Sequence, residues 1–484
     1  MQGVGAVSDG ATRILANSIY RAAAEVGAKL ASLVLFGVMA RRLGDEGFGV
    51  FAFGLAFVML ITALANFGQD WILTREVARD QRRIHHYFAN TLVLKTLLAV
   101  PALAIGVSAA LLLGNDSETV AVILFLGIAV VAEQFMATCF GAFQAHDRVD
   151  FIAVALLSQR IVTAIAGVVA LLLGANVVVV SVVYLGGACF ALALAFALLA
   201  RRVVRPKASV DRGSWWPLIR VALPVGIATV FGTILFRVDI AILALFSSDA
   251  VVGHYGGAFR LFEATLFLSW SVGTATYPVF SRLTRMSDPP AGLVFERSLK
   301  LVVAATLPLA VGAMMLAEPV ITLFYGSEFE PGAMALALLA PAIALFPIAH
   351  IAGGLLVAQD RQTAVGVVYG LVAAQNLVGN LILVPLFSLE GAAVETSITQ
   401  LLLAIAFVTL ASRTVGGLDW FRILAGPAIA GATAAAMMLA LSHLFPAAIA
   451  TAAAAYVLTL LVFERLAYPE DARTLRRFIR REAG

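Results

Sequence analysis

Long, uninterrupted apolar runs recur along almost the whole chain and limit what it can fold into. The run Leu98 to Leu113 is followed at once by another, Val120 to Val131. A helix that crosses a bilayer needs about 20 mostly apolar residues. Hydrophobic residues make up 61% of the 484 residues and charged residues 13%, whereas soluble domains are roughly half apolar and a quarter charged. The sequence therefore predicts an all-α integral membrane protein.

Turn residues and charges divide the apolar runs into about fourteen expected transmembrane helices. These spans are expected near residues 16–40, 48–69, 88–113, 119–142, 151–174, 177–200, 218–246, 252–278, 298–325, 333–358, 363–386, 390–411, 422–443 and 446–464.

The distribution of Lys and Arg tests this count, because basic residues gather on the cytoplasmic connections of a membrane protein. Of the 33 basic residues, seven lie within the expected spans and two, Arg41 and Arg42, lie on the side opposite the N-terminus. The other 24, among them Lys300 and Arg422 at span ends, lie in loops, tails and adjoining span ends on the side of the N-terminus. Both termini are therefore expected in the cytoplasm.

The connection after the sixth span carries five basic residues and reads as a linker between two halves. It divides the chain into five expected parts: an N-terminal lobe of six helices (1–200), a cytoplasmic basic linker (201–217), a C-terminal lobe of six helices (218–412), two further helices (413–464) and a cytoplasmic basic tail (465–484).

A short internal match supports two related halves. The residues 48–51 (FGVF), which enter the second span, resemble the residues 252–255 (VGHY), which enter the eighth. An offset of six helices keeps both copies in the same membrane orientation, so the match predicts parallel repeats. Chance similarity between apolar helices is the alternative explanation.

Ionisable residues inside the spans are the main candidates for function, because a charge within a bilayer is costly unless it faces a cavity or a partner. Arg21, Glu25 and Lys29 are four residues apart along the first span and share one helix face. Arg21 can snorkel to the membrane surface, but Lys29 is too deep for that. This stripe is expected to face a cavity.

Two further ion pairs are expected at one depth, toward the outer ends of neighbouring spans. Arg237 and Asp239 lie on the seventh span, and Arg260 and Glu263 lie on the eighth. These pairs are either part of a transport site or cross-links between helices.

Lys95 and Glu133 also lie at similar depth and are expected to pair, whereas Arg160 in the fifth span has no evident acidic partner. Over the first eight spans seven basic residues stand against four acidic ones. Glu318 and Glu395 in later spans reduce that excess to seven against six. If the first eight spans line a cavity, its positive charge suits an anionic substrate, since the Arg guanidinium matches phosphate oxygens.

The sequence offers little for catalysis or metal binding. Cys139 and Cys189 lie in apolar runs and are expected in the core, while His85 and His86 lack the accompanying ligands of a metal site. We expect no catalytic residues, no metal and no bound cofactor, and the modest net charge of +4 gives no reason to expect nucleic acid. A membrane-embedded transferase, the alternative of another class, would need a sizeable polar loop, and none is evident.

Several motifs, taken together, resemble one family. The residues 39–51 (MARRLGDEGFGVF) resemble the "ARxLGxxxFGxY" signature of the Wzx-type polysaccharide flippases, a branch of the multidrug/oligosaccharidyl-lipid/polysaccharide exporter superfamily. Phe51 stands where that signature has tyrosine, which is a conservative difference. Weaker matches follow in order up to about Thr396, among them NFG at 66–68, RVD at 237–239, VGHY at 252–255 and YGSEF at 325–329.

The resemblance implies two six-helix lobes around a central cavity, two extra C-terminal helices, and alternating access. It also implies that an undecaprenyl-diphosphate-linked oligosaccharide moves to the outer leaflet of the bacterial cytoplasmic (inner) membrane. Arg237 and Arg260 lie inside matching motifs and become candidate substrate contacts. Asp239 becomes a candidate for proton or Na⁺ coupling, with Glu25 and Glu263 as further coupling candidates. Arg21, Lys29 and Arg160 are substrate candidates on charge alone.

The resemblance implies membrane lipid and the lipid-linked oligosaccharide as partners, with a polysaccharide polymerase and assembly proteins beside them. Two rivals belong to the same superfamily. A multidrug or metabolite antiporter would favour acidic residues for cationic cargo, which the basic excess argues against. A peptidoglycan-precursor flippase would also want a basic cavity, so charge does not separate it from a polysaccharide flippase.

Overall fold

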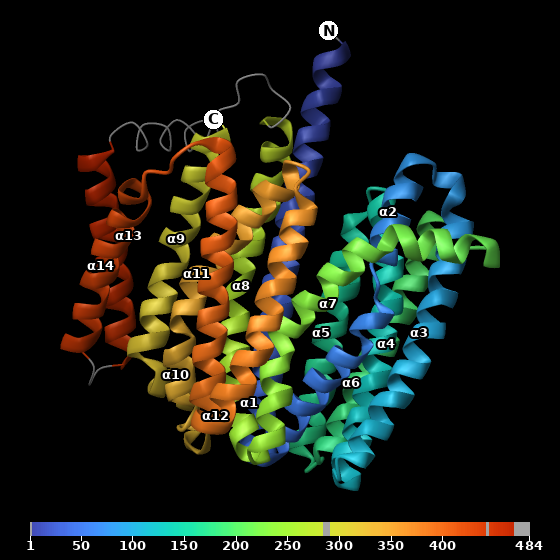
Figure 1. Ribbon diagram of the computed structural model, residues 1–484, viewed down its shortest axis with the longest axis horizontal. Coiled ribbons are helices and arrows are strands. Elements are labelled where there is room, and N and C mark those ends of the chain that lie inside the picture. The colour runs from blue at the N-terminus through green and yellow to red at the C-terminus, as the bar shows by residue number, and fades with distance from the viewer. Residues whose placement is uncertain (1, 284–290, 442–444, 469–484) are drawn as a thin grey trace. The chain divides into compact units, whose positions relative to one another are not determined.

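The computed structural model describes residues 2–283, 291–441 and 445–468, with side chains described from Gly27 onward apart from Leu64, Ala291 and residues 445–446. All regular elements in these ranges are helices (Figure 1). The all-α fold class expected from the sequence is confirmed.

The described part of the chain contains fourteen α-helices. Their bounds are α1 (Gln2–Thr62), α2 (Gln69–Arg79), α3 (Ile84–Leu112), α4 (Ser117–Ala145), α5 (Val149–Leu172), α6 (Val177–Leu198), α7 (Trp215–Phe246), α8 (Asp249–Leu283), α9 (Ala291–Met315), α10 (Ala317–Tyr325), α11 (Gly332–Ala358), α12 (Gln362–Val415), α13 (Trp420–Ala440) and α14 (Phe445–Ala467).

Two of these helices each hold two of the expected spans. The backbone leaves helical geometry at Gly44 in α1 (φ 71°, ψ −175°) and at Ser388 in α12 (φ 52°, ψ −129°). The Ser388 hydroxyl lies 3.0 Å from that of Ser247. Eleven described helices are long and apolar enough to cross a membrane. Counting α1 and α12 twice gives thirteen, and the less apolar α8 completes the fourteen expected spans.

Two expected spans are interrupted. The second was expected to continue to residue 69, but α1 ends at Thr62, and α2 begins as a new helix after Gly68, which adopts φ 76°. The ninth was expected over 298–325, but it breaks at Leu316 into α9 and α10. Pro319 explains the second break, since a proline cannot donate a hydrogen bond to Met315 and its ring clashes with that carbonyl.

The helices pack into two compact units. Unit 1 comprises the described residues up to Gly256 together with Ala373–Leu389, and unit 2 comprises those of Gly257–Val372 and those from Glu390 onward. In unit 1, α1 packs against α5 and α7, and α4 packs against α6. In unit 2, α9 packs against α11 and α13, with α14 beside α13 (Figure 1). The division into lobes at residues 201–217 stays a prediction, because these units record packing and not movement.

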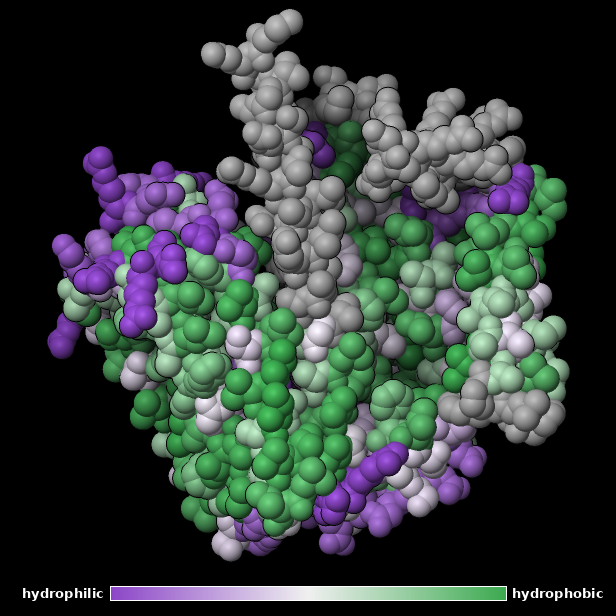
Figure 2. Space-filling model, turned by 180° about the vertical axis from the view of Figure 1, so that it is seen from behind, coloured by the Kyte–Doolittle hydropathy of each residue, from purple (hydrophilic) through white to green (hydrophobic). Residues whose placement is uncertain are grey.

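The surfaces of the helices are apolar along their middle parts and hydrophilic toward their ends (Figure 2). Val100 on α3 and Ile165 on α5, for example, are 60% and 62% exposed. Cys189 was expected in the core but is exposed on α6. Such exposed apolar side chains need lipid as solvent, so the protein crosses the membrane many times.

The basic linker is anchored to unit 1 by Asn90, whose side chain is fully buried on α3. The amide nitrogen of Asn90 donates to the carbonyls of His86 (2.7 Å) and Ser209 (2.9 Å). Its oxygen accepts from the backbone N–H of Asp211 (3.0 Å) and from the indole N–H of Trp215 (2.8 Å). Three of these four bonds hold the segment that leads into α7, so this segment of the linker has a defined place.

Replacing Asn90 with Ala is expected to release the linker, because one buried side chain supplies all of these bonds. We expect trypsin to cut after Lys207 at least about tenfold faster than in the wild type, as a loss of roughly 1.4 kcal/mol or more of local stability would produce. Asn115→Ala is the control, since the Asn115 side chain donates to the Ala110 carbonyl, at the far end of α3 from the linker. Equal cleavage rates in wild type and Asn90→Ala would show that Asn90 does not hold the linker.

Candidate substrate site in unit 1

Arg160 lies at the centre of a polar cluster formed by α4, α5 and α6. One guanidinium nitrogen donates to the Tyr184 hydroxyl (3.1 Å), and the other lies 3.8 Å from a carboxylate oxygen of Glu133. The same oxygen accepts from the Gln159 amide (2.6 Å) and from the Tyr184 hydroxyl (3.4 Å). The expectation that Arg160 lacks an acidic partner was therefore wrong.

The cluster is polar, charged and partly open although it lies midway along its helices. The Arg160 side chain is 31% exposed and that of Glu133 is 24% exposed. A guanidinium presents five N–H donors in a planar fork that fits a phosphate group. An anion that reaches Arg160 would find a positive charge held in position by Glu133 and Tyr184.

Lys29 lies at about the same depth as Arg160, on the helix that packs along α5. A Cβ at Gly27 would lie 3.2 Å from the Leu157 side chain, and further along Gly167 faces Leu35. Because α1 and α5 run in the same direction with the same rise per residue, Lys29 falls level with Gln159 and Arg160. Lys29 is partly buried there. The first-span stripe extends to Arg21 and Glu25, whose side chains lie outside the described residues.

The structure places Arg237 and Asp239 in the interior, 8% and 2% exposed respectively. One carboxylate oxygen of Asp239 accepts from the Ile240 N–H (2.8 Å). The other accepts from the hydroxyl of Tyr255, which joins α7 to α8. This burial favours the cross-linking interpretation of the Arg237–Asp239 region, and the substrate and coupling roles of these two residues stay predictions.

Arg260 and Glu263 form the expected ion pair within α8. A guanidinium nitrogen of Arg260 lies 2.9 Å from a carboxylate oxygen of Glu263, and the two side chains are 19% and 15% exposed. The spacing of three residues places both on one helix face. Their roles in substrate binding and coupling stay predictions.

A second buried charge in unit 1 pairs differently from the expectation. Lys95 was expected to pair with Glu133, but its ammonium donates to Asp70 (2.6 Å) and to the carbonyl of Gln134 (2.7 Å). Lys95 is fully buried, and Thr138 donates to the other oxygen of Asp70 (2.8 Å). Side chains of neighbouring residues on a helix point about 100° apart. The Glu133 side chain points toward Arg160, and Lys95 bonds the backbone carbonyl of Gln134 instead. The sequence carried one signal of this pairing, the carboxylate of Asp70 just after the turn at residue 68.

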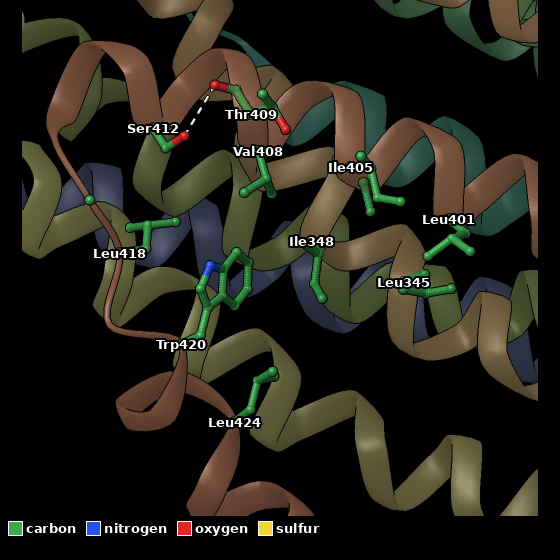
Figure 3. Close-up of a pocket in the computed structure, with 12 residues that line it drawn as sticks. Leu345, Ile348, Leu401, Ile405, Val408, Thr409, Ser412, Leu418, Trp420 and Leu424 are labelled. Atoms are coloured by element: carbon green, nitrogen blue, oxygen red, sulfur yellow. Dashed lines mark hydrogen bonds between the residues drawn. The ribbon is translucent and has the colours of Figure 1, made fainter.

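A cavity of about 600 Å³ in unit 2 has a different chemical character (Figure 3). It is lined by leucine, isoleucine and valine from α11 and α12, with Trp420 and Leu424 from α13. The Ser412 hydroxyl, one of its few polar groups, donates to the Thr409 carbonyl (3.1 Å). The twelve lining residues include no charged side chain, so the cavity suits a hydrocarbon chain better than a diphosphate.

The two copies of the internal sequence match meet where α1 and α8 approach each other within unit 1. A Cβ added at Gly49 would lie 3.0 Å from the backbone nitrogen of Gly253 and would overlap the carbonyl of Asp249. A Cβ added at Gly253 would overlap the carbonyl of Asp45. Only glycine allows backbones to approach so closely. The His254 ring nitrogen, 3.0 Å from an Asp45 carboxylate oxygen, adds a polar contact.

The first residue of α8, Asp249, lies beside this contact among other carboxylates. Burial, and then the nearby charges of Asp116 and Glu46, raise the pKa of Asp249 above its ordinary value of 3.8. The folded state thus binds this proton more tightly than the unfolded state. The resulting stabilisation is fully present below pH 3.8 and is lost as the pH rises through the raised pKa.

Asp249→Asn should therefore raise the unfolding temperature at pH 7 in detergent, and the gain should shrink as the pH falls toward 3.8. Asn176→Ala is a control of opposite sign, because the Asn176 side chain caps α6 by accepting from the Val179 N–H and carries no charge. Its loss should cost about 1 kcal/mol at neutral pH. A lower unfolding temperature for Asp249→Asn at pH 7 would contradict the assignment.

Residues 14–284, more than half of the chain, match the family described as "Polysaccharide biosynthesis protein". Among curated proteins, the chain is 22% identical over 368 residues to a protein of Haloferax volcanii named "Probable low-salt glycan biosynthesis flippase", covering 74% of this chain and 75% of that protein. It is 26% identical over 322 residues to a Shigella dysenteriae protein named "Putative O-antigen transporter", covering 60% and 72%.

Solved structures resemble the fold at low sequence identity. The lipid II flippase MurJ in an inward closed conformation matches with a TM-score of 0.79 and 13% identity, over 93% of this chain and 99% of that one. An inward-facing multidrug transporter of the MATE family matches with a TM-score of 0.64 and 15% identity, over 82% and 98%. The chain thus shares its fold with these transporters, and by the match over residues 14–284 it belongs to the polysaccharide biosynthesis protein family.

Proposed function

We propose that this protein is a flippase that moves undecaprenyl-diphosphate-linked oligosaccharide repeat units from the cytoplasmic to the outer leaflet by alternating access. The observation that carries the proposal is the partly exposed Arg160 at mid-helix, with Lys29 level with it on the adjacent helix. Arg160 and Lys29 thus place two basic side chains at one level within the membrane-spanning part of unit 1. The names of the two relatives support a glycan-related cargo.

The chemistry of this cluster fits the diphosphate of the cargo better than its sugars. Arg160 offers parallel N–H donors and Lys29 a mobile ammonium, which together suit the several oxygens of a diphosphate. Glu133 and Tyr184 hold the guanidinium in place before the cargo arrives, which reduces the entropy lost on binding. In this proposal the polyprenyl chain stays in lipid during transfer.

Coupling, location and partners are further parts of the proposal. We place the protein in the bacterial cytoplasmic membrane with both termini in the cytoplasm, because basic residues crowd the connections on that side. Proton or Na⁺ binding at Asp239, Glu263 or Glu25 would drive the cycle. A polysaccharide polymerase and assembly proteins would receive the exported unit.

Complementation in cells tests the cargo class. Expression in a bacterial strain lacking its own polysaccharide flippase should restore surface polysaccharide, provided that the strain makes a repeat unit this protein accepts. Strains that differ only in their repeat unit show which oligosaccharide is accepted. Growth of a strain depleted of its peptidoglycan-precursor flippase shows whether that precursor is accepted. If the cells gain resistance to cationic dyes but no strain regains its surface polysaccharide, the antiporter is favoured and the proposal is contradicted.

Arg160→Gln should lower transport about tenfold or more without reducing the amount of inserted protein, because a charge-assisted contact to the diphosphate contributes about 1.5–3 kcal/mol. In Arg160→Gln the carboxylate of Glu133 loses its nearby positive charge. The double variant Glu133→Gln with Arg160→Gln removes that carboxylate too, and its transport should stay equally impaired. Arg361→Gln, which alters an exposed arginine between α11 and α12, is the control. Recovery of transport in the double variant would mean that Arg160 serves only to neutralise Glu133.

A further inference from the structure

We propose that the exposed face of α2 binds the phosphate of an anionic membrane phospholipid. Trp71, Arg75 and Arg79 are spaced four residues apart and so share one face of the helix. Trp71 is 51% exposed and the Arg79 side chain is 68% exposed. Arg83, the residue just before α3, extends this face. We call these four residues the α2 stripe.

Three arginines of the stripe converge on one carboxylate. A guanidinium nitrogen of Arg75 lies 2.9 Å from Glu76, one of Arg83 lies 3.1 Å away, and one of Arg79 lies 3.4 Å away. Because Glu76 balances only one of the three positive charges, the cluster keeps a local excess of two. Converging guanidinium groups with unbalanced charge are the usual setting for a phosphate group.

The stripe also carries the aromatic contacts of a membrane interface. The Arg75 guanidinium lies over the Trp71 ring, 5.0 Å from its centroid, and that of Arg83 lies 5.1 Å from the centroid of Tyr87. Exposed tryptophan is enriched where the hydrocarbon meets the head groups. The span that contains α3 begins within a few residues of Arg83. The stripe thus lies at the depth of lipid phosphates.

The opposite face holds α2 rigidly in unit 1. Ile72, Leu73 and Val77 are 2% exposed or less. Asp70 binds Lys95, and the Thr74 hydroxyl lies 3.2 Å from the Gly141 carbonyl. A fixed helix keeps the arginines in place before the lipid arrives. The preference for positive charge in the cytoplasm explains how many arginines are present, but not their convergence or their stacking on aromatic rings.

The test compares lipids bound to the purified full-length protein by native mass spectrometry, with phosphatidylglycerol and phosphatidylcholine of identical chains. We expect a preference for phosphatidylglycerol that weakens as salt rises. Arg75→Gln with Arg79→Gln should weaken phosphatidylglycerol binding about 30-fold, at about tenfold per 1.4 kcal/mol and about 1 kcal/mol per basic residue. The control, Arg361→Gln with Arg413→Gln, removes two exposed charges from unit 2 and should change binding less than about threefold.

Three outcomes would overturn the proposal: no preference for phosphatidylglycerol in the wild type, an equal loss in the control, or binding of undecaprenyl diphosphate without phosphatidylglycerol. The last would assign the α2 stripe to the transported lipid. Should the double variant fail to fold, Arg79→Gln alone changes the most exposed arginine of the stripe and should weaken binding about fivefold. Binding is measured without transport, so the result does not depend on the proposed flippase activity.

Discussion

Asp70→Asn is expected to destabilise the protein by about 3 kcal/mol, because it leaves the fully buried ammonium of Lys95 without a carboxylate. The affected contacts join three helices, since Asp70 lies in the first turn of α2, Lys95 on α3 and Thr138 on α4. The measurement is the free energy of unfolding in detergent, or the unfolding temperature as its proxy.

Two further variants make this result specific. Lys95→Met together with Asp70→Asn removes both charges and should recover most of the lost stability, as replacing a whole buried pair often does. Asp150→Asn breaks an ion pair with Arg148 in which both side chains are at least 40% exposed, and it should cost less than about 1 kcal/mol. If Asp70→Asn costs no more than Asp150→Asn, the buried pair does not hold these helices together.

Gly49→Ala is the second substitution with a large expected effect. The added methyl group would overlap the carbonyl of Asp249, which is backbone and cannot rotate away as a side chain can. Overpacking of this kind costs about 1–3 kcal/mol, and we expect the upper end of that range. Gly253→Ala should behave similarly, because its methyl group would meet the backbone of Asp45.

The matched control is Gly186→Ala on α6, where a Cβ would meet nothing within 4 Å. There alanine should be neutral or stabilise the helix by up to about 1 kcal/mol. Unfolding temperatures of the three variants in one detergent give the comparison. Equal stability of Gly49→Ala and Gly186→Ala would show that α1 and α8 can separate at little cost.

The number and order of the spans could be predicted from the sequence because the need to bury apolar segments in lipid dominates their placement. Gly44 and Ser388 both fall between expected spans, so the departures from helical geometry in α1 and α12 were predicted. The breaks after Thr62 and at Leu316 were not, because both lie within apolar runs of the length that one span needs.

The partners of the charged residues depend on how each helix is rotated about its axis, which periodicity alone determines poorly in an apolar helix. Glu133 and Gln134 are neighbours, and a turn of about 100° decides which of them faces Lys95 and which faces Arg160. Glycines show the same difficulty. A Cβ added at Gly253 would overlap the carbonyl of Asp45, whereas one added at Gly366 would meet nothing within 4 Å, and helix rotation decides between the two.

The central claim, leaflet transfer of a lipid-linked oligosaccharide, is tested most directly in proteoliposomes. A fluorescent undecaprenyl-diphosphate oligosaccharide is placed in both leaflets, and an impermeant quencher reports how fast the inner pool reaches the outside. We predict transfer well above that in empty vesicles and about tenfold or more faster than with Arg160→Gln. Transfer no faster than in empty vesicles, with folded protein confirmed in the same vesicles, would contradict the flippase proposal.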